Sequence, residues 1–244
     1  MLRFFRSIRS QLLNNNKTGK YFRYAIGEIL LVVIGILIAL QINNWNEGRK
    51  QKAIANEYRK TLINDIAEDT ANIHNHVEEA REFKNDIDAY FEFFRTGNSS
   101  VKDLVSRAQN TRSPIYRYQP INHTFLSMQS SGGLNLLSEP EKRILMELSI
   151  YQNHTGVVFE KLISDFFVRR NKRNEFLQND GEDGDFYEVI GKNRSEEELI
   201  LGLKYQNLLL SNNRAMQEQM IKRGKYMLEL SREVLSLLEG KLDN

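Results

Sequence analysis

One uninterrupted apolar run, residues 25–40, constrains this chain more than any other feature. With its flanks it supplies the roughly 20 apolar residues that a helix needs to cross the hydrocarbon core of a bilayer. A buried helix of a soluble protein normally keeps a polar face, and none exists between Ile29 and Leu40. The run therefore predicts a single transmembrane helix at residues 21–44.

The flanks of this segment are typical of a membrane interface. Arg23 and Tyr24 lie at its start and Trp45 directly follows it, which places charged and aromatic side chains at both headgroup levels. Leu40 follows Ala39, so the small-residue pattern of a signal-peptidase site is absent. We therefore expect an uncleaved signal anchor.

Charge predicts the orientation of the anchor. Six basic residues and no acidic residue precede the run: Arg3, Arg6, Arg9, Lys17, Lys20 and Arg23. The positive-inside rule then places the N-terminus in the cytoplasm and the C-terminal domain in the periplasm. Residues 1–20 form a predicted basic amphipathic segment that can lie on an anionic leaflet. A mitochondrial transit peptide has a similar composition, but the apolar span that follows favours a plain anchor.

The net charge outside the N-terminal segment and the absence of cysteine argue against several classes of protein function. The net charge is +2, and without the six N-terminal basic residues the chain has four more acidic than basic residues. It carries no basic stripe with interleaved aromatic residues, which argues against a nucleic-acid partner. With no cysteine there can be no disulfide and no thiolate metal site. No cofactor motif is present, so we expect no cofactor.

The anchor also carries a family resemblance. The motifs are Tyr24-Ala25-Ile26-Gly27-Glu28, Val32-Val33-Ile34-Gly35-Ile36 and Leu40-Gln41-Ile42-Asn43-Asn44-Trp45-Asn46-Glu47. They resemble an uncharacterised family of single-pass membrane proteins from Gram-negative bacteria, classed as a domain of unknown function. The resemblance implies an inner-membrane setting and a helical C-terminal portion. It implies no catalytic residues.

A heptad pattern predicts one long stalk or bundle helix over residues 45–95, which has no Pro and only Gly48 before Gly97. Its apolar seam follows alternating steps of three and four: Ile63, Ile66, Thr70, Ile73, Val77, Ala80, Lys84, Ile87, Phe91 and Phe94. Polar Thr70 and Lys84 on this seam argue against a long dedicated coiled coil. Residues 96–137 are predicted to be a connection with short helices.

Two capping boxes mark the later helices. Ser138 with Glu141 begins a predicted helix at 138–178, and Ser195 with Glu198 begins one at 196–240, after an acidic loop at 179–195. The long C-terminal helix has a predicted apolar stripe: Leu199, Leu203, Leu210, Met220, Met227, Val234 and Leu238. This helix matches the stalk helix in length, and such pairs pack most simply antiparallel. The expected fold is all-α: one N-terminal transmembrane helix that continues into an extended helical stalk, with an antiparallel helical bundle.

Glu28 is the only ionisable residue in the apolar run, and two interpretations stay open. It can be an interfacial carboxylate near Arg23, or it can belong to a helix–helix contact face. That candidate face consists of Glu28, Leu31, Gly35, Ala39 and Ile42. Gly35 and Ala39 on it have small-xxx-small spacing.

The other polar clusters give little indication of a metal-binding or phosphate-binding site. His74 and His76 point to different sides of a helix, so they cannot share a metal ion, and His123 and His154 are isolated. The acidic loop lacks the calcium-loop order. Ser130-Ser131-Gly132-Gly133 lacks a P-loop lysine, so Gly132 and Gly133 are interpreted as a hinge between helices.

These patterns predict a membrane-anchored, non-enzymatic periplasmic helical module. Its partners would be the lipid bilayer and another protein or a second copy, as a subunit or accessory of an envelope assembly or signalling complex. The alternative is an envelope enzyme or a metal- or small-ligand-binding bundle, with a site assembled from scattered His and Glu residues.

Overall fold

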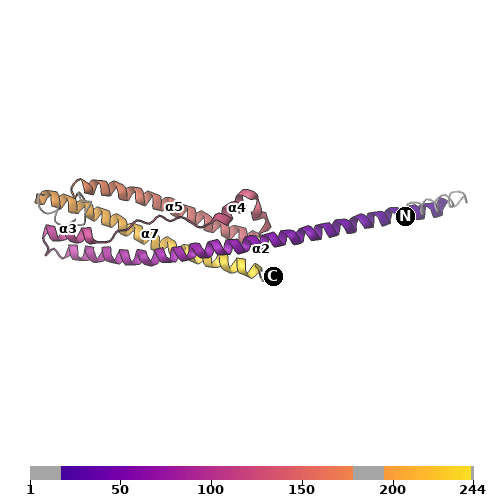
Figure 1. The fold of residues 1–244 in the computed structure, drawn as a ribbon, viewed down its shortest axis with the longest axis horizontal. Coiled ribbons are helices and arrows are strands. Elements are labelled where there is room, and N and C mark those ends of the chain that lie inside the picture. Colours follow the sequence, from indigo (N-terminus) through magenta and orange to yellow (C-terminus); the bar gives the residue numbers. More distant parts are fainter. Residues whose placement is uncertain (1–17, 178–194, 243–244) are drawn as a thin grey trace, which may run out of the picture. The chain divides into compact units, whose positions relative to one another are not determined.

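We describe the computed structural model of the chain over residues 18–177 and 195–242 (Figure 1). The helices are α2 (Thr18–Arg95), α3 (Val101–Asn110), α4 (His123–Ser131), the 3₁₀ helix η1 (Gly133–Leu136), α5 (Glu139–Asn174) and α7 (Glu196–Leu242). No strand occurs in these residues, and the all-α prediction is confirmed. The basic segment at residues 1–17 and the acidic loop up to residue 194 lie outside the described residues.

The chain divides into two compact units, Met1–Ala55 and Asn56–Asn244. Both units contain part of α2. The first unit contributes only the N-terminal part of α2 to the described residues. The second unit is the helical bundle, formed by the C-terminal part of α2 with all later helices.

Local sequence signals set the helix ends. At α5 the Ser138 N–H donates to Glu141 Oε2 over 2.7 Å and Pro140 lies in the first turn, so the predicted capping box is confirmed. At α7 the Ser195 N–H donates to Glu198 Oε2 over 2.9 Å, and Ser195 Oγ accepts from the Glu198 N–H. α4 ends at Gly132, whose φ of +77° is strained for any residue with a side chain.

Side-chain contacts fix the direction of the long helices in the bundle. Residues 77 and 90 of α2 meet residues 224 and 207 of α7, so these two helices run antiparallel. Residues 59 and 69 of α2 meet residues 141 and 152 of α5, so those two run parallel. Residues 147 and 173 of α5 meet residues 226 and 206 of α7. α7 is therefore antiparallel to both α2 and α5.

The core of the bundle is a row of three apolar clusters along these helices. The middle cluster includes Ile73, Val77, Phe159, Met216 and Met220. Each of these residues is less than 2% exposed. A second cluster joins the start of α5 to the end of α7, and the third lies beneath α3. The apolar stripe predicted for α7 is buried throughout: Leu199, Leu203, Leu210, Met220, Met227, Val234 and Leu238.

The predicted seam of α2 needs a correction. Ile66, Ile73, Val77, Ala80 and Ile87 are buried as expected. The other buried positions are Leu62, Asp69 and Tyr90, rather than the neighbours assigned from the sequence. Those neighbours are only half-buried, except for Phe94, which is exposed: Ile63, Thr70, Lys84, Phe91 and Phe94. The predicted seam used Thr70 in place of Asp69, because a carboxylate is rarely buried unless hydrogen-bond donors surround it.

Residues 111–122, which we call the strap, join α3 to α4 without helix or strand. In Figure 1 the strap is the thin ribbon that runs along the long helices. Tyr116 and Tyr118 on it are buried, so the strap is anchored in the packed interior by these two side chains, while residues such as Arg117 are exposed. Its backbone groups have no sheet partner, so side chains or water must satisfy them.

Candidate functional site

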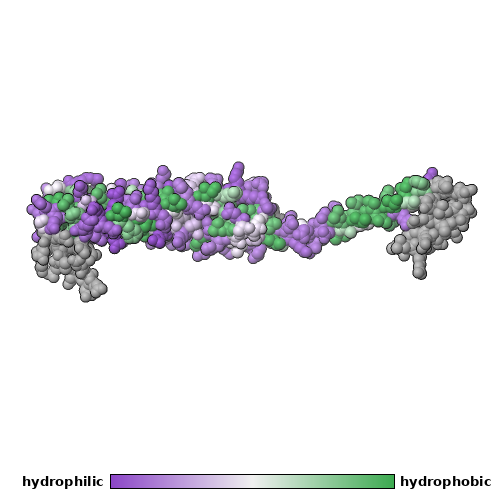
Figure 2. Space-filling view, turned by 90° about the horizontal axis from the view of Figure 1, so that it is seen from above, coloured by the Kyte–Doolittle hydropathy of each residue, from purple (hydrophilic) through white to green (hydrophobic). Residues whose placement is uncertain are grey.

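No residue of the apolar segment of α2 is buried, and most of its residues are exposed. Figure 2 shows the segment as a continuous hydrophobic surface. A water-soluble helix would not expose so many large aliphatic side chains. α2 is thus long and apolar enough to span a membrane.

The predicted contact face of this segment is unobstructed. Leu31 is 69% and Ile42 is 61% exposed, Ala39 is exposed, and Glu28 is half-buried. A Cβ atom built on Gly35 would have no neighbouring atom within 4 Å. The face is therefore available to another helix, and its use as a contact stays a prediction.

Two of the three predicted interface anchors have exposed side chains. Trp45 is exposed and Arg49 places its guanidinium carbon 5.6 Å from the indole centroid. Arg23 is also exposed, while the side chain of Tyr24 lies outside the described part of the chain. The Trp45–Arg49 pair combines an aromatic body with a charge, as expected at a headgroup level.

In the bundle, the strap is fastened by a buried carboxylate that sequence reasoning missed. Asp69 is 1% exposed and accepts from Tyr118 Oη over 3.0 Å, Gln152 Nε2 over 2.7 Å and the Ile121 N–H over 3.1 Å. Burial raises the pKa of Asp69, and the hydrogen bonds from Ile121, Tyr118 and Gln152 oppose that rise. Because its three donors come from the strap and α5, Asp69 ties α2 to both.

Side-chain amides of α7 hold the strap from the other side. Asn213 Nδ2 donates to the Pro114 carbonyl over 2.8 Å, and Gln217 Nε2 donates to the same oxygen over 3.4 Å. Just before the strap, Gln206 Nε2 donates to the Ala108 carbonyl over 3.0 Å. These side-chain amides donate the hydrogen bonds that the backbone carbonyls would receive from a neighbouring strand in a β-sheet.

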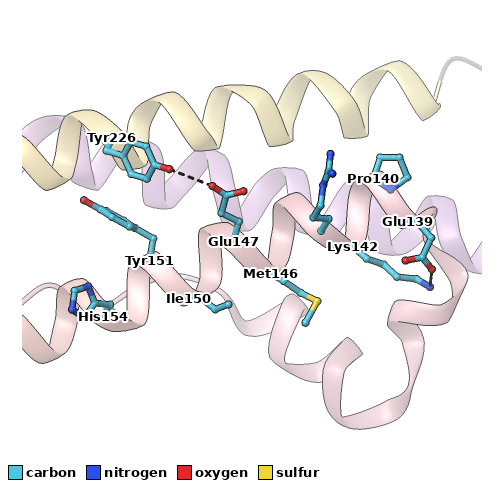
Figure 3. Close-up of a pocket in the computed structure, with 10 residues that line it drawn as sticks. Glu139, Pro140, Lys142, Met146, Glu147, Ile150, Tyr151, His154 and Tyr226 are labelled. Atoms are coloured by element: carbon cyan, nitrogen blue, oxygen red, sulfur yellow. Dashed lines mark hydrogen bonds and ion pairs between the residues drawn. The ribbon is translucent and has the colours of Figure 1, made fainter.

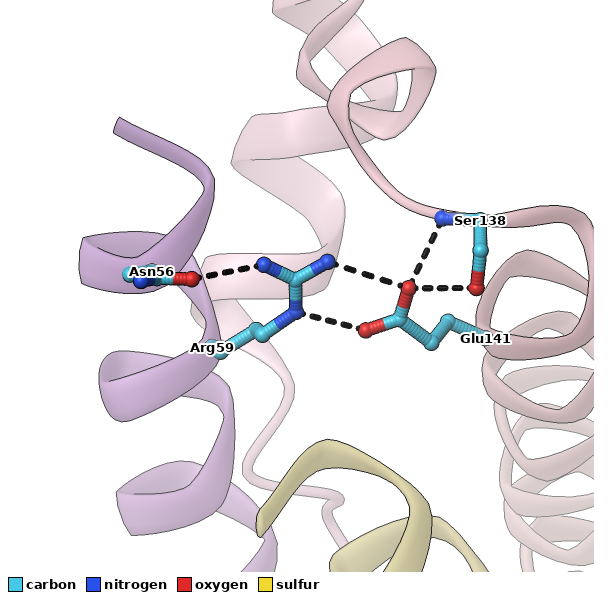
Figure 4. A network of polar contacts seen from close by, with 4 residues as sticks. All are labelled: Asn56, Arg59, Ser138 and Glu141. Carbon is cyan, nitrogen blue, oxygen red and sulfur yellow. Dashed lines mark hydrogen bonds and ion pairs between the residues drawn. The ribbon is translucent and has the colours of Figure 1, made fainter. Parts of the chain in front are cut away.

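The second buried carboxylate closes one end of the bundle (Figure 4). Arg59 Nε and Nη2 donate to the two oxygens of Glu141 over 2.6 and 3.1 Å, and Arg59 Nη1 donates to Asn56 Oδ1 over 2.8 Å. Burial opposes ionisation of Glu141, but the bonds from Arg59 and Ser138 outweigh it and lower its pKa. The forked pair joins α2 to the first turn of α5.

The two predicted hinge glycines have different environments. Gly132 has positive φ, and a Cβ atom on it would meet nothing within 4 Å. Gly133 is buried, and a Cβ atom there would lie 3.3 Å from Tyr58 Cε2. Gly132 therefore ends a helix and Gly133 allows close packing on α2, while a hinge motion at this pair stays a prediction.

The histidines are scattered over the bundle. His74 is exposed, while His76 is half-buried and packs edge-on against Tyr116 at a centroid distance of 5.4 Å. His154 Nδ1 lies 3.3 Å from Arg223 Nη1. Within residues 18–177 and 195–242, no group of three His, Asp or Glu side chains is placed to hold a metal ion. The acidic cluster at residues 180–185 lies outside the described residues.

The outer surface of the bundle has a groove of about 810 Å³ between α5 and α7 (Figure 3). Tyr151 and Tyr226 form its aromatic wall with ring centroids 4.5 Å apart, and Tyr226 Oη donates to Glu147 over 3.2 Å. Met146 and Ile150 line the opposite part and are 44% and 67% exposed. The groove combines exposed aliphatic groups with a charged rim, which suits a protein surface better than a small polar ligand.

The comparison with known families decides the membership of the chain. A family model, DUF6090, described as a family of unknown function, matches residues 28–210. The chain belongs to this family. The match begins within the apolar segment and reaches into α7, so DUF6090 includes both the exposed apolar helix and most of the bundle. No curated protein and no solved structure matches the chain.

Proposed function

We propose that this DUF6090 protein is a single-pass inner-membrane protein whose helical bundle lies in the periplasm and binds a partner protein. In this role it serves as a non-enzymatic subunit or accessory of an envelope assembly or signalling complex. The observation that carries the proposal is the apolar segment of α2, none of which is buried, in a chain whose second unit forms a bundle with its own core.

The distribution of charge supports the orientation. All six basic residues before the apolar segment lack an acidic neighbour, whereas Glu47 and Glu57 partly offset the basic residues after it. Positive residues are retained on the cytoplasmic side during insertion. The N-terminus is then cytoplasmic and the bundle periplasmic.

The buried polar groups support a binding role over catalysis. Asp69 is engaged by three donors of the bundle itself, and Glu141 by Arg59 and Ser138. Groups used in this way hold the strap and the helices together. The exposed aliphatic groups at the α5–α7 groove offer an apolar contact surface to a partner protein.

The decisive experiment is extraction of the tagged full chain from native membranes in mild detergent, with mass spectrometry of a single sized peak. We expect the chain in the membrane fraction together with a stoichiometric companion. A chain found only in the soluble fraction would overturn the membrane assignment. A chain that elutes as a lone monomer, with turnover in substrate screens, would overturn the binding role.

The absence of cysteine allows a clean test of topology. Single cysteines at Ser7 and Asn98 can be labelled in intact spheroplasts with a membrane-impermeant maleimide. We expect labelling of Asn98→Cys and protection of Ser7→Cys until the membrane is permeabilised. The opposite pattern would reverse the orientation.

A further inference from the structure

The outward face of α5 carries aliphatic side chains that no described part of the bundle covers. Ile150 and Val157 are 67% and 68% exposed, and Met146 is 44% exposed. The core of the bundle uses the opposite face of the same helix, where Leu148, Gln152, Thr155 and Phe159 are buried. We call Met146, Ile150 and Val157 the outer seam of α5.

The aliphatic residues of the outer seam have the spacing of a two-stranded coiled coil. Ile150 and Val157 are seven residues apart at successive a positions, and Met146 precedes Ile150 by four at position d. The d position between Ile150 and Val157 holds the polar residue Asn153. β-Branched residues at position a favour dimers of parallel helices. The seam therefore fits a second helix with the same spacing.

The charges beside the seam select a second copy of this chain. Lys142 and Glu147 occupy the g and e positions that flank it. In a parallel, in-register pair, Lys142 of each copy faces Glu147 of the other. Their contacts within the chain, Lys142 to Glu139 at 2.8 Å and Glu147 to Tyr226 at 3.2 Å, lie at the surface and leave acceptor and donor capacity.

In the parallel, in-register arrangement, each residue of the outer seam lies opposite the same residue of the second copy. This arrangement sets Ile150 against Ile150 and Val157 against Val157 of the two copies. An antiparallel pair centred on Ile150 would instead set Met146 against His154. The groove between α5 and α7 gives room beside the seam for the flanking side chains of the second helix.

Three aliphatic side chains per copy provide little area for a stable dimer, because specific interfaces bury about 1,200–2,000 Å² in total. Anchoring of both copies in one bilayer raises their effective concentration and compensates for a small contact. We propose that α5 pairs in parallel and in register with α5 of a second copy in the same membrane. The inference rests on the proposed membrane anchoring and names one partner of the bundle.

Disulfide cross-linking in native membranes tests the pairing with the full chain. Single cysteines at Ile150 and Val157 are oxidised with copper phenanthroline, and dimers are read on non-reducing gels. Asn72→Cys, at an exposed position of α2, is the control for random collision. We expect about tenfold more dimer at both seam positions than at the control. Equal yields at all three positions would overturn the proposal.

A second pair of variants distinguishes the register. Met146→Cys co-expressed with His154→Cys should form little mixed dimer in the parallel arrangement. A strong mixed dimer, together with loss of the Val157→Cys dimer, would show the antiparallel arrangement and refute the parallel one. Lys142→Glu should weaken cross-linking at Ile150→Cys, and adding Glu147→Lys should restore it. Failure of that rescue would remove the charge argument.

The outcomes separate this inference from the proposed function. Recovery of the chain in the membrane fraction with a different companion, but without cross-links at Ile150 or Val157, would overturn self-pairing and leave the proposed function intact. Absence from the membrane fraction would overturn both.

Discussion

Gly224 on α7 and Val77 on α2 lie so close together that a Cβ atom on residue 224 would overlap the Cγ2 methyl group of Val77. The two long antiparallel helices therefore pack tightly at a position where one of them has no side chain. Val77 has a stiff, β-branched side chain and sits in the buried middle cluster, so it has no space to move.

This contact predicts that Gly224→Ala destabilises the bundle, although alanine is the better helix former. Overpacking of a filled core costs about 1–3 kcal/mol. Gly156→Ala is the matched control, because its Cβ atom would have its nearest neighbour, the Tyr118 carbonyl oxygen, at 3.9 Å. We expect that control to gain about 0.5–1 kcal/mol. Thermal unfolding of the full chain in detergent, followed by circular dichroism, measures both, and a neutral Gly224→Ala would contradict the tight contact.

The buried ion pair of Arg59 and Glu141 predicts that a substitution of Glu141 that keeps its shape strongly lowers the stability of the bundle. Glu141→Gln keeps the shape but removes the charge that two guanidinium nitrogens share, and we expect a loss of about 2–4 kcal/mol. Glu139→Gln is the control, since Glu139 is 86% exposed in its pair with Lys142. That exposed substitution should cost less than about 1 kcal/mol. Equal losses for the two variants would contradict the assigned role of Glu141.

The same pair has a defined pH dependence. The pKa of Glu141 is lowered in the folded chain, so its stabilisation is present above the ordinary value of 4.5 and is lost as the pH falls through the folded value. The advantage of the parent chain over Glu141→Gln should therefore shrink in acid. Unfolding curves of both proteins across the acid range measure it, and a constant difference would be evidence against the lowered pKa.

The contribution of Asp69 to stability is predicted to change with pH in the direction opposite to that of Glu141. Burial raises its pKa above 3.8, so ionised Asp69 costs stability at neutral pH, and that cost disappears as the pH falls through the folded pKa. The stability of the parent chain relative to Asp69→Asn should therefore rise as the pH is lowered. Asp165→Asn, which makes the same change at an exposed position of α5, serves as the control. The same unfolding curves measure it, and a trend in the reverse direction would show that the donors outweigh burial.

The strap depends on donors from α7. Asn213→Leu removes the donor that lies 2.8 Å from the Pro114 carbonyl and leaves only the longer bond from Gln217. An unsatisfied buried acceptor costs about 1–3 kcal/mol, so the strap should open more often. Limited trypsin digestion reports this opening at Arg117, an exposed strap residue. Cleavage there should accelerate in Asn213→Leu and stay unchanged in Asn85→Leu, which alters an exposed residue of α2.

Periodicity and caps sufficed to predict the all-α fold, the apolar span, the core stripe of α7 and the start of α5. In each case neighbours in sequence carry the signal: Ser138 and Glu141 are three residues apart and form the predicted box. The strap was missed because its partners are remote: Asp69 and Ile121 are 52 positions apart in the sequence. Asp69 itself was passed over because only the folded chain brings its three donors together. The outer seam of α5 could have been found from the aliphatic residues opposite the core stripe.

The contact face in the apolar segment gives the last prediction. Gly35 has no neighbour within 4 Å of a built Cβ atom, and small residues let two membrane helices approach closely. Gly35→Leu should therefore weaken association with another span by about 1–2 kcal/mol, which is about a tenfold loss of co-purifying protein. Gly27→Leu makes the same change about 80° around the helix and is the control, since its surroundings are equally open. Quantitative mass spectrometry of detergent extracts decides the outcome: equal recovery of the companion in both variants would show that the face of Glu28, Leu31, Gly35, Ala39 and Ile42 is in contact with lipid alone.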